Sequence, residues 1–143
     1  MGRKQRSVEG SSRCSAAPER VWEVWTAPEG WPGDVIEVGA VDGEFAVGST
    51  VTVKVKGGVK TKSTLTRVDA PKIWTSVTRF PGLTLTYEHV IDGSADGTVL
   101  TERVIMTGPF AGLFDRMARG QLQQTFTAVT ADIARSAETA PPH

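Results

Sequence analysis

Two titratable side chains stand among apolar residues in segments with the pattern of β-strands. His89 alternates with apolar or aromatic residues at positions 83, 85, 87 and 91, and Glu102 alternates with apolar residues at positions 100, 104 and 106. Because successive side chains of a strand point to opposite faces, both groups are expected to face an apolar interior. An imidazole or a carboxylate placed there can move a proton, so His89 and Glu102 are the candidate catalytic residues.

Each candidate also has a structural interpretation. His89 can be a hydrogen-bonded histidine of the core or its rim, and Glu102 can be a rim residue paired with a basic side chain of a neighbouring strand. The segment 92–97 between them is interpreted as a six-residue hairpin loop, which leaves the register of the two strands open. A shift by one residue would move Glu102 to the opposite face of the sheet. The sequence therefore does not decide whether the two groups face each other.

Other side chains suited to an organic ligand are spread along the chain. Tyr87 offers a hydroxyl and Arg79 a planar cation, which could bind a carbonyl, a phenol or a carboxylate. Trp31 and Trp74 could stack on a planar ligand, although large aromatic residues usually fill cores. Four apolar residues of the C-terminal segment are first of all core residues, and would form part of the wall if a cavity exists: Phe110, Phe114, Met117 and Phe126.

Composition narrows the function classes. Sixteen basic and sixteen acidic residues cancel, which does not favour nucleic acid or a membrane surface as partner. No phosphate-binding loop, dinucleotide fingerprint, nucleophile elbow or zinc-protease motif occurs, so neither a cofactor nor a metal is expected. Cys14 is the only cysteine and is interpreted as a packed thiol. Without a disulfide, a signal sequence or an apolar run of ~20 residues, we expect a cytoplasmic protein with no membrane insertion.

The elements expected to position these groups follow from local patterns. Residues 5–14 are weakly β-like, and a short helix is expected after them, with Ser15 or a neighbour as cap and Pro18 in the first turn. A cluster of Pro and Gly at 28–33 ends it. Six strands are predicted between residues 35 and 105, where β-branched residues and turn signals recur. In the clearest of them, residues 50–56, valines alternate with Thr or Lys.

The last 30 residues change to a helical period. Apolar residues recur at steps of three and four from Phe110 to Ile133, which predicts one long amphipathic helix beginning near Pro109. Gly120 lies in the middle of it and is expected to allow a bend or a close approach of another backbone. The last four residues are expected to fray.

The predicted fold is α+β: seven antiparallel strands curved around one long C-terminal helix, with one or two short helices after the first strand. That order, with Ala17-Pro18-Glu19-Arg20-Val21-Trp22, Val68-Asp69-Ala70-Pro71 and Gly108-Pro109-Phe110, resembles the superfamily of START domains, pollen-allergen-like lipid binders and polyketide cyclases. The small bacterial polyketide cyclase/dehydrase-like proteins are the most similar group. The resemblance covers about residues 5–138 and implies a helix-grip fold with an internal cavity for hydrophobic ligands. The length of the chain predicts a single domain over residues 1–143, with a core of about 5–138 and flexible termini.

Three functions remain open from the sequence. The first is a binding module that holds a small hydrophobic or aromatic molecule in the cavity. The second is a cyclase- or dehydratase-like enzyme that uses His89 or Glu102 for proton transfer. The third is a protein-interaction module, as in co-chaperone relatives, with an exposed apolar face as the contact. The chain is expected to be a monomer or a weak homodimer.

Overall fold

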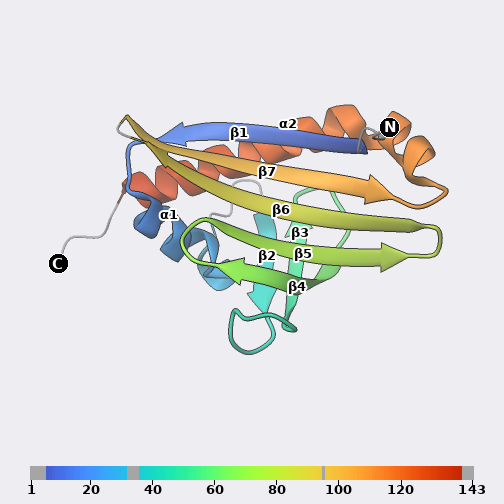
Figure 1. The fold of residues 1–143 in the computed structure, drawn as a ribbon, viewed down its shortest axis with the longest axis horizontal. Coiled ribbons are helices and arrows are strands. Elements are labelled where there is room, and N and C mark those ends of the chain that lie inside the picture. The colour runs from blue at the N-terminus through green and yellow to red at the C-terminus, as the bar shows by residue number, and fades with distance from the viewer. Residues whose placement is uncertain (1–5, 32–35, 95, 140–143) are drawn as a thin grey trace, which may run out of the picture.

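A computed structural model describes residues 6–31, 36–94 and 96–139. One antiparallel sheet of seven strands curls around a single long helix, and two short helices follow the first strand (Figure 1). This arrangement confirms the predicted α+β helix-grip fold. The expected flexible terminus before Arg6 and the expected frayed end after Thr139 lie outside the described residues.

The first strand, β1 (Arg6–Cys14), leads into the helix α1 (Pro18–Trp25) and the 3₁₀ turn η1 (Pro28–Gly30). Helix α1 starts after Ala17, and no side chain caps it. The prediction that Ser15 or a neighbour caps this helix is therefore wrong. The backbone N–H and the hydroxyl of Ser15 instead donate to Glu138 Oε2, at 2.8 and 3.2 Å, which ties the start of α1 to the C-terminal end of the chain.

The six predicted strands are present. They are β2 (Ile36–Val41), β3 (Thr50–Val55), β4 (Thr61–Asp69), β5 (Ile73–Phe80), β6 (Leu83–Ser94) and β7 (Gly97–Thr107). Their order in the sheet is β1-β7-β6-β5-β4-β3-β2, so β1 and β2 form the two edges. The sheet curls strongly, and β2 and β3 cross behind the longer strands at a steep angle (Figure 1).

The connection between β6 and β7 is shorter than expected. The ladder continues to the pair Ser94 and Gly97, so most of the predicted loop 92–97 is paired strand. The left-handed backbone of Gly97, with φ of +128°, suits a residue without a Cβ at this tight reversal. The tight turn fixes the register that the sequence left open, and it places His89 directly opposite Glu102.

The long helix, α2 (Ala111–Glu138), packs mainly against β1 and β7 and runs back along the sheet (Figure 1). It begins two residues later than predicted. The approach is closest at Gly10 of β1, where a Cβ would lie 2.5 Å from the backbone nitrogen of Thr127. Gly120 has no atom within 4 Å of such a position, so of its two expected roles, a bend or a close approach, the close approach is absent.

Buried side chains form two clusters. The larger one joins α1, the C-terminal half of α2 and the inner face of the sheet, and it includes Trp25, Leu65, Trp74, Leu100 and Ile133. The smaller one, around Val104 and Phe126, joins β1, β6 and β7 to the middle and start of α2. The pocket described next lies between these two clusters.

Candidate functional site

A pocket of about 240 Å³ opens between the inner face of the sheet and the middle of α2. Its wall is mostly apolar. The valines of β3 at positions 51, 53 and 55 line one side of it. Their alternation with polar residues predicted that they share one face of the strand. Leu122, Phe126 and Val129 of α2 line the other side. Val59, between β3 and β4, and Gln121 of α2 line it and are also exposed to solvent, so they mark the mouth of the pocket.

His89 is held rigidly in the wall. Its side chain is 7% exposed, and its ring lies flat on the indole of Trp74, with centroids 3.4 Å apart. The ring atom Nδ1 lies 3.1 Å from the backbone oxygen of Trp74. A carbonyl oxygen can only accept, so Nδ1 must carry a hydrogen and donate it. In neutral His89 the other nitrogen, Nε2, is therefore an acceptor.

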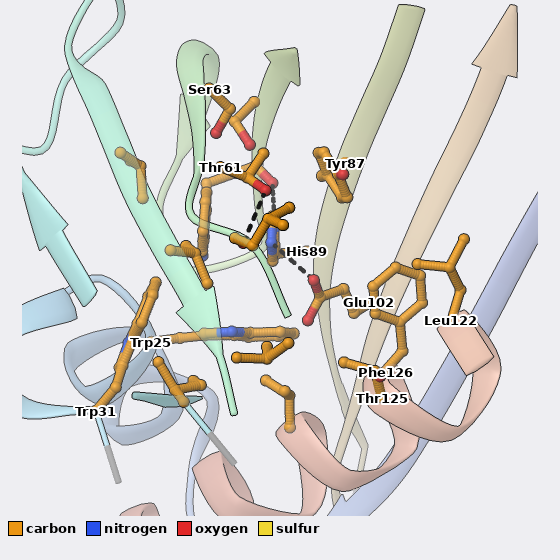
Figure 2. A pocket seen from close by; sticks show the side chains of 18 of the residues that line it. Trp25, Trp31, Thr61, Ser63, Tyr87, His89, Glu102, Leu122, Thr125 and Phe126 are labelled. Carbon is orange, nitrogen blue, oxygen red and sulfur yellow. Dashed lines mark hydrogen bonds and ion pairs between the residues drawn. The ribbon is translucent and has the colours of Figure 1, made fainter. Parts of the chain in front are cut away.

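Glu102 completes a pair with this nitrogen. Its Oε2 atom lies 3.6 Å from His89 Nε2, and its side chain is 13% exposed. The two side chains point toward each other across the floor of the pocket (Figure 2). The neighbouring Arg103 points to the outer face, where its guanidinium binds Glu9 and Glu88 at 2.9 and 2.8 Å. Glu102 thus belongs to the inner face, as the alternation of β7 predicted.

Tyr87 stands beside this pair on β6 and packs edge-on against Phe126, with ring centroids 6.5 Å apart. Burial of the phenol, with a smaller contribution from the negative charge of Glu102, raises the pKa of Tyr87 to about 12. The phenol therefore keeps its proton through the physiological range. The hydroxyl of Tyr87 can therefore donate or accept a hydrogen bond without carrying a charge.

This shift gives a direct prediction, because Tyr87 is the only tyrosine of the chain. An ultraviolet titration should show phenolate absorbance with a midpoint near 12 in the folded protein, against about 10 in the unfolded chain. Between these two midpoints the phenol of Tyr87 is protonated in the folded state and ionised in the unfolded state. The contribution of Tyr87 to the free energy of unfolding is therefore complete below pH 10 and declines as the pH rises toward 12. A folded-state midpoint at the ordinary value would contradict the described environment.

Three indole rings line the pocket next to His89. The rings of Trp25 and Trp74 are nearly perpendicular, with centroids 6.3 Å apart, and Trp31 lies nearly parallel to Trp74 at 6.4 Å. The indole Nε1 of Trp31 donates to the carbonyl of Val24 at 3.1 Å. The indole Nε1 of Trp74, by contrast, is buried without a hydrogen-bond partner among the described residues. A wall of such aromatic rings can pack against a planar apolar ligand.

The structure brings together six of the ten side chains that the sequence singled out, on the pocket wall: Trp31, Trp74, Tyr87, His89, Glu102 and Phe126. The other four lie elsewhere. Arg79 is exposed near the end of β5, and Phe114 packs against the smaller core cluster. Phe110 and Met117 are 56% and 76% exposed. Phe110 precedes α2 and lies beside Gly82 of the β5–β6 turn, and Met117 lies on the side of α2 that faces away from the buried Ala111 and Asp115.

Several wall residues were not predicted from the sequence. They include Trp25 and three hydroxyl side chains, Thr61, Ser63 and Ser76. Ser63 and Ser76 are 9% and 3% exposed. Small polar residues at inward-facing positions of a strand were the available signal, because a core without a cavity would favour larger apolar side chains there. Within the described part of the chain, no cluster of three or more His, Cys, Asp or Glu is arranged for a metal.

Comparison with known proteins identifies the family of the chain. Residues 5–138 match the family described as polyketide cyclase/dehydrase and lipid transport. The chain belongs to this family. No curated protein matches it in sequence. No described helix has both the length and the apolar character to cross a membrane.

Solved structures with the same fold share little sequence with this family member. Norcoclaurine synthase from Thalictrum flavum, in complex with dopamine and hydroxybenzaldehyde, is 14% identical with a TM-score of 0.70, and the match covers 100% of this chain and 96% of that one. Protein SSP2350 from Staphylococcus saprophyticus is 16% identical with a TM-score of 0.68, covering 94% and 93%. DynU16, from the dynemicin biosynthetic locus, is 20% identical with a TM-score of 0.71, covering 95% and 48%. These similarities establish the fold of the chain.

Proposed function

We propose that this protein binds a small, planar, hydrophobic molecule in the pocket between the sheet and α2. The observation that carries this proposal is the pocket itself, which is lined by valines and aromatic rings and has one polar pair at its floor. Burial in such a wall supplies affinity, and a few fixed polar groups supply orientation. Membership of a family described by polyketide chemistry and lipid transport supports the same class of ligand.

The volume of the pocket limits the size of the ligand. An engineered protein cavity of ~150 Å³ holds benzene, so a pocket of about 240 Å³ accommodates roughly ten non-hydrogen atoms on the same scale. One fused pair of rings fits this space. A longer ligand would have to extend through the mouth between Val59 and Gln121.

A second candidate function is proton transfer to or from the bound molecule. The position of His89 directly opposite Glu102 favours it. Neutral Nε2 of His89 can take a proton from a ligand, and the carboxylate 3.6 Å away would stabilise the imidazolium that forms. The same pair could return that proton to another atom of the ligand. Turnover of a bound compound, abolished in His89→Ala, separates this function from binding alone.

The binding proposal is tested by calorimetric titration with naphthalene. Ala118 lines the pocket and is half-buried on α2, so Ala118→Trp should fill the space and weaken naphthalene binding at least ~10-fold, equivalent to about 1.4 kcal/mol. Gln124→Trp adds the same side chain at an exposed position of α2 outside the pocket wall and should leave binding unchanged. Equal naphthalene affinity in all three proteins, or none in the original protein, would contradict the proposal.

A further inference from the structure

His89 Nε2 and Glu102 Oε2 face each other without forming a good hydrogen bond. Because Nδ1 of His89 donates to Trp74, only Nε2 is free to meet Glu102. The Nε2 to Oε2 separation of 3.6 Å is too long for a good hydrogen bond. Both side chains are nevertheless largely buried, at 7% and 13% exposed, and polar groups that face an apolar wall are normally satisfied by a partner.

A single hydroxyl can satisfy both atoms when the pair holds one proton. If the proton is on His89, the hydroxyl oxygen accepts from Nε2–H and donates to the carboxylate. If the proton is on Glu102, the hydroxyl accepts from the carboxylic acid and donates to Nε2. A carbonyl or ether oxygen can only accept, so it would leave one member of the pair without a partner. The hydroxyl oxygen would stand at the apex of a triangle above the two atoms, within reach of both.

We infer that the pocket selects aromatic molecules that carry a hydroxyl group, a phenol or a ring-conjugated enol, with this hydroxyl bridging His89 Nε2 and Glu102. This inference rests on the proposed binding function and specifies its ligand class. Tyr87 adds a third polar group beside the pair and lines the same pocket. Its phenol offers a donor to a second oxygen on the ring system, which would favour ligands oxygenated at more than one position.

The test compares three bicyclic probes of similar size: 2-naphthol, 2-methylnaphthalene and 2-naphthaldehyde. The methyl compound matches the hydroxyl in size without polarity, and the aldehyde offers only an acceptor. Water solvates the three differently, so the quantity compared between proteins is the ratio of the naphthol affinity to that of each other probe. Glu102→Met keeps an unbranched side chain and removes the carboxylate. Glu37→Met is the control, because the carboxylate of Glu37 pairs with Lys54 outside the pocket.

The ratio should fall roughly 10-fold in Glu102→Met, the size expected for loss of a hydrogen bond to a charged group, and should be unchanged in Glu37→Met. If Glu102→Met does not fold, His89→Phe gives the same comparison while keeping a ring against Trp74. Binding of all three probes with a ratio that these variants leave unchanged would overturn the hydroxyl inference and leave the pocket proposal standing. Failure of 2-methylnaphthalene and of naphthalene to bind would overturn the pocket proposal itself.

Discussion

Trp74→Ala is expected to lower the free energy of unfolding by about 3–5 kcal/mol, the range for removal of a buried aromatic side chain. Trp74 is 1% exposed and lies on the central strand β5. Its indole contacts His89 face to face and packs nearly perpendicular to the rings of Trp25 and Phe45. Alanine would leave these rings without their common neighbour. Urea denaturation followed by circular dichroism measures the loss.

Two further substitutions make this test specific. Trp22→Ala removes the same side chain at a partly buried position of α1 and should cost less than about 2 kcal/mol. Trp74→Phe keeps a ring against His89 and removes the indole N–H that is buried without a partner, a group whose burial costs about 1–3 kcal/mol. It should therefore cost less than Trp74→Ala. Equal losses in all three would show that Trp74 does not hold the cluster together.

Gly10→Ala is expected to be the second most damaging single change, with a loss of about 1–3 kcal/mol. The added methyl would lie 2.5 Å from Thr127 N and 2.9 Å from Phe126 C. These are backbone atoms, so no side-chain rotation relieves the overlap, and β1 and α2 must separate. Phe126 is part of the pocket wall, so the same movement would displace its ring and weaken naphthalene binding.

Gly120→Ala is the matched control, because the same methyl group there meets open space on the exposed side of α2. The free energy of unfolding should rise by about 0.5–1 kcal/mol, since alanine favours a helix interior over glycine. Opposite signs for one chemical change at two glycines would establish that the close approach at Gly10 is the cause. A neutral or stabilising Gly10→Ala would contradict the described packing of β1 on α2.

Much of this fold was predictable because its signals are local. The alternation of valines in β3 and the helical period of the C-terminal segment depend on neighbours a few residues apart. The same alternation correctly put His89 and Glu102 on the inner face. Their mutual position depended on the turn between β6 and β7, and its Asp, Gly and Ser residues are typical of a loop as well as of paired strand ends. The sequence pattern therefore predicted two inward groups without predicting the pair.

The errors arise where long-range packing overrides a local pattern. Phe110 and Met117 continue the apolar spacing of the C-terminal segment, but Phe110 lies before the helix begins and Met117 lies on the side of α2 away from the sheet, so both are exposed. Ser15 is a good helix cap by residue type, yet its hydrogen bonds go to Glu138, which lies more than a hundred residues away in the chain. Residue type alone does not show where α2 begins, which of its sides faces the sheet, or that its C-terminal end lies beside Ser15.

The grouping of indoles at one end of the pocket gives the protein an intrinsic optical reporter. Three of its four tryptophans, Trp25, Trp31 and Trp74, line the pocket wall. A molecule that enters would displace water beside these rings and alter the polarity around them, so their fluorescence should change in wavelength or intensity without any attached dye. Occupancy could then be followed in real time on the unmodified chain, including during stopped-flow mixing.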